Sequence, residues 1–261
     1  MPPEYIQGLT SLRNETAADD LPISGTIPTW LAGTLLRNGP GQFEVGERNY
    51  KHWFDALAML HRFTVADGRV SYANRMLGSL DYKESTARGE VAMRGFATDP
   101  CMTAFRRVMS LFDPNMTDNA SVNIVRWDER FIALTESPLA VEFDPVTLKT
   151  TAHRDFHDHI LSRAATTAHP HTHPTTGAIY NLATRFDIPR SFYRIYCYDP
   201  VADERTLLHE IAVPRPAYMH SFGITENYAV LAAYPYTLSV PSLAFGGKSF
   251  AENFTYDADG V

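Results

Sequence analysis

The sequence predicts an all-β protein built from a repeated strand–turn–strand unit. Three short segments rich in apolar and aromatic residues begin at Arg130, Ala178 and Tyr228, which are 48 and 50 positions apart, and each follows a turn. A helical pattern is convincing at only one place. Strand, turn and strand recurring at about forty to fifty residues is typical of β-propeller blades, although other antiparallel sheets can produce this spacing by coincidence.

The elements of the repeat can be followed along the chain. Residues 61–72 predict a first hairpin, because Asp67 and Gly68 supply a two-residue turn. Residues 141–145 and 195–200 each run a strand into an Asp-Pro turn, 55 positions apart when measured to the turns. Between the first hairpin and these strands, residues 99–112 predict a helix, since apolar side chains recur there three and four residues apart. We expect this helix to be an insertion between blades.

Composition and charge restrict the class of partner. Of the 261 residues, 44% are hydrophobic and 20% are charged, as in globular proteins. The 23 Lys and Arg against 30 Asp and Glu give a formal net charge of −7, without a basic run. We therefore expect no nucleic-acid partner. Cys101 and Cys197 form no Cys-x-x-Cys motif, which favours an intracellular protein.

One charge-free stretch, residues 227–247, reaches the length of a membrane span. Pro235 and Pro241 interrupt it, which argues against a spanning helix. A strand followed by an apolar loop is the better interpretation. Such a loop can still dip into a membrane surface. The N-terminus shows no signal-peptide pattern.

Two histidines at equivalent positions of the repeat are candidate metal ligands. His169 lies nine residues before Ala178, and His220 lies eight residues before Tyr228. Equivalent positions at the inner ends of propeller strands point to one axis, so the two imidazoles are expected to converge. Imidazole suits zinc, copper, iron or nickel. A ligating histidine usually donates its other N–H to a carboxylate, and Glu136 is the candidate partner.

Other readings of the histidines stay open. A histidine taken singly is more often a buried structural residue than a ligand. His153 and His157 could share one face of a helical turn and bind a divalent metal, but a solvated connector is the favoured interpretation of that segment. The sequence contains no Gly-x-Ser-x-Gly, Walker or His-Glu-x-x-His motif, which argues against hydrolase chemistry.

Several separated motifs occur from about Leu31 onward. They are residues 33–41 (GTLLRNGPG), 52–55 (HWFD), 58–63 (AMLHRF), 117–123 (TDNASVN), 135–136 (TE), 167–170 (TAHP) and 219–228 (MHSFGITENY). Taken together and in this order, they resemble the carotenoid cleavage oxygenase family. That family includes the retinoid isomerase of the retinal pigment epithelium and the apocarotenoid oxygenases.

The resemblance implies a seven-bladed β-propeller with Fe(2+) on its axis, held by four histidines. His169 and His220 match the first two ligands, Glu136 matches the carboxylate that orients the second, and Val122 matches a position beside the open iron site. Residues 1–30 are then an N-terminal segment, and 31–261 an incomplete propeller of four to five blades with a helical insertion near 99–112. The third and fourth ligands are expected beyond Val261.

The activity that the resemblance implies is oxygen-dependent cleavage of a conjugated double bond. Its substrates would be dioxygen and a carotenoid or apocarotenoid, and its products two carbonyl compounds. Val240, Leu243 and Phe245 match an apolar patch that contacts the membrane, so the protein is expected to be cytoplasmic and peripherally membrane-associated. The alternatives are a catalytically inactive propeller fragment or binding module, and an enzyme of the same fold acting on retinyl esters or stilbene-type olefins.

One position departs from the family pattern. The family's His-Trp-Phe-Asp-Gly reads His-Trp-Phe-Asp-Ala here, with Ala56 in the place of glycine. If this turn requires a positive φ, alanine would destabilise it by about 1 kcal/mol.

Overall fold

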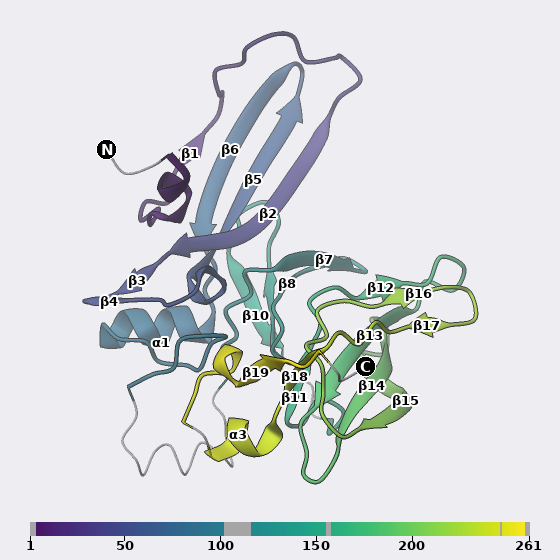
Figure 1. Cartoon of the computed structure of the whole chain (residues 1–261). Helices are drawn as coiled ribbons and strands as arrows, with labels where there is room; N and C mark the ends of the chain where they lie inside the picture. The colour runs from purple at the N-terminus through teal and green to yellow at the C-terminus, as the bar shows by residue number, and fades with distance from the viewer. Residues whose placement is uncertain (1–3, 102–115, 155–157, 246, 259–261) are drawn as a thin grey trace. The chain divides into compact units, whose positions relative to one another are not determined.

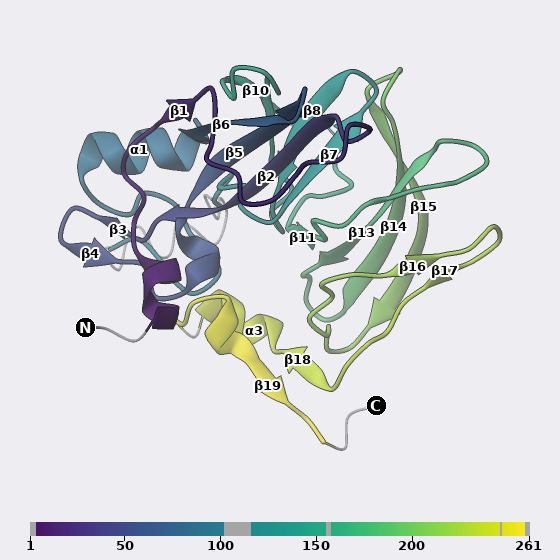
Figure 2. The same cartoon turned by 90° about the horizontal axis from the view of Figure 1, so that it is seen from above.

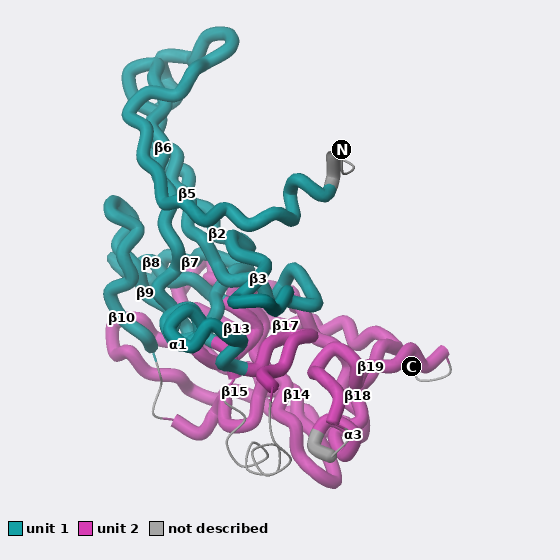
Figure 3. Tube along the Cα trace, turned by 90° about the vertical axis from the view of Figure 1, so that its left-hand side faces the viewer, with its two compact units in different colours: residues 1–93, 118–134, 140–154 teal, residues 94–117, 135–139, 155–261 magenta. Residues whose placement is uncertain are grey.

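A computed structural model describes residues 4–101, 116–154, 158–245 and 247–258. Most of the regular structure is β-strand, with few helices (Figure 1). The chain divides into two compact units, which Figure 3 shows in different colours. Unit 1 comprises residues 1–93, 118–134 and 140–154, and unit 2 comprises residues 94–117, 135–139 and 155–261.

The first sheet of unit 1 is antiparallel and has four strands in the order β1-β6-β5-β2. These are β1 (Ala17–Ala18), β2 (Gly33–Gln42), β5 (Leu57–Ala66) and β6 (Arg69–Met76). Between β5 and β6, Asp67 and Gly68 have φ of 52° and 73°. This left-handed pair matches the right-handed twist of the strands it joins. The hairpin predicted over residues 61–72 is thus present, with longer strands than expected.

The second sheet of unit 1 has the order β10-β9-β8-β7 and is also antiparallel. Its strands are β7 (Asn123–Trp127), β8 (Arg130–Leu134), β9 (Ala140–Phe143) and β10 (Thr150–Arg154). The turn after β9 is held by Asp144, whose Oδ1 accepts the backbone N–H of Val146 at 3.2 Å and of Thr147 at 2.6 Å. The strand predicted from Arg130 and the strand-to-turn predicted over 141–145 are both found.

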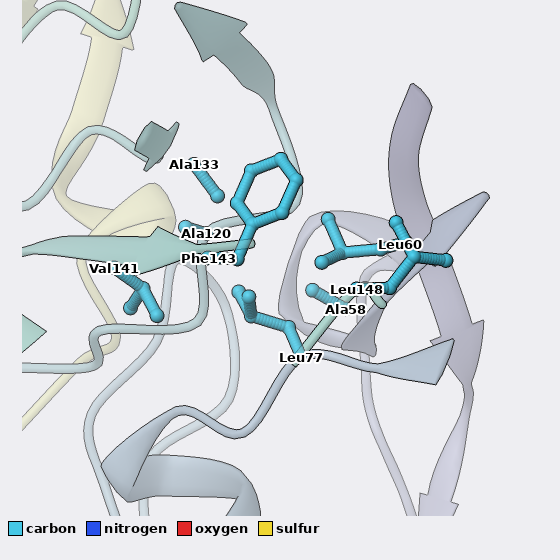
Figure 4. Packing of buried hydrophobic residues seen from close by; sticks show 8 residues of the cluster. All are labelled: Ala58, Leu60, Leu77, Ala120, Ala133, Val141, Phe143 and Leu148. Atoms are coloured by element: carbon cyan, nitrogen blue, oxygen red, sulfur yellow. The ribbon is translucent and has the colours of Figure 1, made fainter. Parts of the chain in front are cut away.

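Aliphatic side chains and one phenylalanine form the main core of unit 1. Leu60 and Ala58 come from β5, Phe143 comes from β9, and Leu77 follows β6, and all are at most 2% exposed. Figure 4 shows these residues packed with four others, Ala120, Ala133, Val141 and Leu148. Because both sheets of unit 1 supply residues, this cluster holds them together.

Unit 1 also contains four short elements: η1 (Glu4–Leu9), β3 (Glu44–Val45), β4 (Arg48–Asn49) and η2 (Trp53–Asp55). Ala56 ends η2 with φ −59° and ψ 137°. This backbone conformation is open to any L residue. The alanine at this position therefore carries none of the strain that a positive φ would impose.

A helix that the sequence analysis missed, α1 (Leu80–Arg88), lies in unit 1. Ser79 caps its start by accepting the N–H of Tyr82 at 3.0 Å, and Gly89 ends it in the left-handed conformation. The Asp118 carboxylate accepts the N–H groups of Leu80 at 2.7 Å and of Asp81 at 2.9 Å. The helix has too few apolar residues for a helical period to stand out, so its caps are the sequence feature that indicates it.

The large sheet of unit 2 has the path β11-β13-β14-β15, and β12 pairs beside β11 along β13. Its strands are β11 (Ala164–Thr166), β12 (His171–Thr172), β13 (Ile179–Arg185), β14 (Ser191–Asp199) and β15 (Glu204–Val213). Figure 2 shows β13, β14 and β15 side by side, and all their pairings are antiparallel. The strands predicted from Ala178 and over 195–200 belong to this sheet.

The other elements in the described part of unit 2 are two-stranded sheets and short helices. β16 (Gly223–Ile224) pairs with β17 (Ala229–Val230), and β18 (Tyr236–Leu238) pairs with β19 (Phe254–Tyr256); α3 (Val240–Phe245) and η3 (Ala251–Asn253) lie between the last two strands. The long strand predicted from Tyr228 is wrong in length, because only two of its residues form β17. Most of the helix predicted over 99–112 lies outside the described residues. No helix in the described ranges is long and apolar enough to cross a membrane.

Candidate metal centre

Two histidine side chains meet within unit 2. His169 lies between β11 and β12, and His220 lies just before β16. Their Nε2 atoms are 3.2 Å apart, and their rings meet edge to face with centroids 4.8 Å apart. The fold thus brings together two imidazoles that are separated by 51 positions in the chain.

The His169 segment is held by a buried asparagine on β13. Asn181 accepts a hydrogen bond from the Thr167 hydroxyl at 2.6 Å and donates to the Thr167 carbonyl at 2.9 Å. The hydroxyl oxygen of Thr167 in turn accepts the backbone N–H of His169 at 3.3 Å. Thr167 is 2% exposed and Asn181 6% exposed. Hydrogen bonds between buried groups are costly to break, so this network fixes the position of the backbone at His169.

A carboxylate fixes the His220 ring. His220 Nδ1 lies 2.7 Å from Glu136 Oε1, and the Tyr218 hydroxyl donates to both Glu136 oxygens, at 2.9 and 2.7 Å. Tyr218 was not among the predicted site residues. It stands two positions before His220, and alternate residues of an extended chain share a side, so the spacing was an available signal.

The hydrogen bond to Glu136 determines which nitrogen of His220 is protonated. A carboxylate only accepts hydrogen bonds, so Nδ1 carries the hydrogen, and in the neutral ring Nε2 keeps its lone pair. The same hydrogen bond raises the pKa of His220. The pKa of His169 is lowered, mainly by burial and also by the neighbouring His220. Burial and the Glu136 charge raise the pKa of Tyr218, so its hydroxyl stays protonated as a donor.

The spacing of the two Nε2 atoms fits a shared metal ion. Imidazole nitrogen binds zinc at about 2.0–2.1 Å, so two such nitrogens on one ion are about 2.8–3.0 Å apart at a right angle and about 3.3–3.4 Å apart at a tetrahedral angle. The observed 3.2 Å lies between these values. Within the described ranges, no group of three or more His, Cys, Asp or Glu side chains is arranged to hold a metal. The pair therefore fits part of a coordination sphere.

The neighbouring histidines make other contacts. His171 Nε2 lies 2.7 Å from the Phe222 carbonyl oxygen. His173 is buried, and its Nδ1 accepts backbone N–H groups of Thr175 and Thr176. His153 lies on strand β10 in unit 1, not on the helical turn considered above, and its Nδ1 lies 3.2 Å from Asp118 Oδ2. His157 lies outside the described residues.

The other predicted site residues lie in segments of the chain that differ from those of His169, His220 and Glu136. Val122 belongs to unit 1, where its N–H donates to the Leu134 carbonyl. The three residues of the predicted membrane patch, Val240, Leu243 and Phe245, fall on α3 in unit 2. Val240 and Leu243 are half-buried, and the side chain of Phe245 lies outside the described part.

A family model decides which proteins this chain is related to. The model of the retinal pigment epithelial membrane protein family matches residues 9–260. The chain belongs to this family. Curated carotenoid oxygenases are among its relatives. A carotenoid isomerooxygenase from Galleria mellonella is 40% identical over 232 residues, and a β,β-carotene 15,15′-dioxygenase from Mus musculus is 35% identical over 262 residues.

Solved carotenoid oxygenase structures share the fold. A variant of the Synechocystis apocarotenoid oxygenase superposes with a TM-score of 0.79 at 27% identity, covering 97% of this chain and 53% of that one. The cobalt-substituted form of the Synechocystis enzyme gives a TM-score of 0.79 at 26% identity, covering 98% and 54%. The two curated relatives are covered to 45% and 46% by alignments that include 84% and 91% of this chain. The chain thus spans about half the length of its carotenoid oxygenase relatives, and its all-β fold is part of their propeller.

Proposed function

We propose that this chain forms the part of a carotenoid-cleaving oxygenase that supplies two ligands, His169 and His220, to Fe(2+). The observation that carries the proposal is the Nε2 pair at 3.2 Å, with Glu136 on the far nitrogen of His220. A carboxylate behind a ligating imidazole is the usual arrangement at metal sites. The relatives named for carotene cleavage and the cobalt-substituted neighbour support this choice over a purely structural histidine pair.

Each residue of the cluster has a distinct task in this proposal. Iron would supply the redox chemistry by which dioxygen converts a conjugated carbon–carbon double bond into two carbonyl groups. His169 and His220 would hold the ion through Nε2. Glu136 keeps the His220 Nε2 lone pair available by accepting the Nδ1 hydrogen, and the Tyr218 hydroxyl holds both oxygens of that carboxylate in place. Val122 is proposed to limit access beside the open iron site.

The substrate class rests on the names of the relatives. They are described as carotenoid isomerooxygenase, β,β-carotene 15,15′-dioxygenase and carotenoid-cleaving dioxygenase. We therefore propose a carotenoid or apocarotenoid and dioxygen as substrates. The alternative is an enzyme of the same fold whose substrates are retinyl esters or stilbene-type olefins.

The test uses protein expressed from its complete reading frame. We expect the purified wild type to contain iron and to release aldehydes from β-carotene or an apocarotenal. His220→Ala should lose most of its iron and its aldehyde formation, because one ligand is removed. His209→Ala is the matched control, since this histidine is exposed on strand β15, and it should retain both.

Full iron content in the His220→Ala protein would contradict the ligand assignment. An iron-loaded wild type that forms no product from any polyene would point instead to a binding module. Hydrolysis of a retinyl ester, or cleavage of a stilbene without cleavage of carotenoids, would reassign the substrate.

We also propose a peripheral membrane contact from the cytoplasm through Val240, Leu243 and Phe245. The support is the absence of charged residues over 227–247 and the position of all three on α3. Leu243→Glu should reduce co-flotation of the protein with phosphatidylcholine vesicles, because a charge opposes insertion into the apolar layer. Leu208→Glu, at an exposed position of β15, is the control. Equal flotation of both variants and the wild type would contradict the contact.

A further inference from the structure

The imidazole of His171 contacts the segment that carries His220. Its Nε2 lies 2.7 Å from the carbonyl oxygen of Phe222, and the two rings meet edge to face with centroids 4.9 Å apart. A carbonyl oxygen only accepts hydrogen bonds, so His171 Nε2 carries the hydrogen and donates it. That nitrogen is therefore committed to the protein backbone and has no lone pair to offer a metal ion.

Both ends of this contact are anchored in unit 2. His171 opens β12 and pairs with Tyr180 of β13. Phe222 is 7% exposed and packs in a hydrophobic cluster with Leu182 and Met219. The hydrogen bond thus joins β12 of the large sheet to a buried residue of the segment that carries His220.

The contact repeats the offset of the histidine pair. His169 meets His220, and two residues further along both segments His171 meets Phe222, so each contact joins residues 51 positions apart. Alternate residues of extended segments project to the same side. The two segments therefore run alongside each other in one register, and a slip by one residue would turn His220 away from His169.

We propose that His171 is a positioning residue, which sets the register of the His220 segment against the His169 segment by donating a hydrogen bond to the Phe222 carbonyl. This inference rests on the proposed function, because the register matters for a metal bound by both histidines. Glu136 sets the orientation of the His220 ring, whereas His171 sets where the His220 backbone lies. Loss of the Glu136 contact should weaken metal binding by releasing the His220 ring, and loss of the His171 contact should weaken it by releasing the His220 backbone.

The experiment compares three proteins expressed from the complete reading frame: wild type, His171→Ala and His171→Gln. Glutamine places an amide N–H close to the position of the histidine Nε2, so it can restore the donor without an imidazole. The first readout is hydrogen exchange of the backbone over residues 219–224 in metal-free protein. The second is the affinity for Co(II), used as the probe metal. His209→Ala controls for the loss of an exposed histidine.

We expect His171→Ala to exchange about fivefold faster over residues 219–224, which corresponds to the loss of one hydrogen bond of about 1 kcal/mol. Its affinity for Co(II) should fall about tenfold, as for other residues that orient ligands. His171→Gln should stay close to wild type in both readouts. Wild-type exchange in His171→Ala would overturn the proposal, and so would a His171→Gln protein as defective as His171→Ala. If the wild type binds no Co(II), the proposed function fails, while the exchange comparison still decides the role of His171.

Discussion

At the scale of single residues, the Glu136 carboxylate joins two other side chains of the candidate centre. It accepts hydrogen bonds from Tyr218 at both oxygens and from His220 at one. Its backbone also takes part, because the Glu136 carbonyl accepts the N–H of Thr166 at 2.9 Å. The same residue thus ties the end of β11 to the orientation of the His220 ring.

Removing the Tyr218 hydroxyl should measure how much this network contributes to stability. Tyr218→Phe keeps the ring but leaves both Glu136 oxygens without that donor. We expect the free energy of unfolding to fall by about 2 kcal/mol, since hydrogen bonds to charged groups contribute about 1.5–3 kcal/mol. Urea unfolding followed by circular dichroism gives the value.

Tyr234→Phe is the matched control for this change, because Tyr234 is 65% exposed. It should change the free energy of unfolding by less than about 0.5 kcal/mol. Equal effects of the two substitutions would show that the hydrogen bonds from the Tyr218 hydroxyl to Glu136 do not stabilise the folded protein.

Two residues of the centre were accessible from the sequence because they occupy equivalent places in a repeat. His169 and His220 precede their strands by similar distances, and this position separates them from the other histidines. His171 and Tyr218 could not be assigned in the same way. Their roles depend on the Phe222 carbonyl and on the Glu136 carboxylate, which lie 51 and 82 positions away. The position of Tyr218 two residues before His220 indicates a shared side of the chain, but no local pattern indicates the Phe222 carbonyl as the partner of His171.

At the scale of elements, strong local signals gave correct strands and hairpins. Asp67 and Gly68 predicted the β5–β6 turn, since both adopt the left-handed conformation that an Asp-Gly turn requires. The apolar segment from Ala178 became β13 because it packs in the middle of a sheet. The similar segment from Tyr228 formed only the two-residue β17, whose residues are exposed. The segment from Tyr228 is at least as apolar as the segment from Ala178, so tertiary packing and not apolar content made the difference.

Helix α1 offers a test at this scale, because its sequence signal consists of caps. Gly89 ends the helix at φ +67°, and a Cβ added there would meet nothing within 4 Å. Gly89→Ala should therefore lower the free energy of unfolding by about 1 kcal/mol through backbone strain alone. Gly89→Asn should lower it less, since asparagine tolerates this conformation better. A Gly89→Ala protein as stable as the wild type in urea would show that the helix end relaxes.

At the scale of the whole molecule, the candidate centre lies within one compact unit. Glu136, His169 and His220 all belong to unit 2, although 84 positions separate the first from the last. The large antiparallel sheets of both units contain strands that the strand–turn–strand repeat predicts. The family match over residues 9–260 includes residues of both units. Unit 2 thus supplies both imidazoles and the carboxylate that contacts His220.

The central claim is that His169 and His220 hold one iron ion together. The most direct measurement is a crystal structure of the protein expressed from its complete reading frame, with an anomalous difference map recorded at the iron absorption edge. We expect one iron peak about 2.1 Å from the Nε2 atoms of both histidines, by analogy with other imidazole–metal bonds. An iron-loaded crystal whose anomalous peak lies away from these two nitrogens would contradict it.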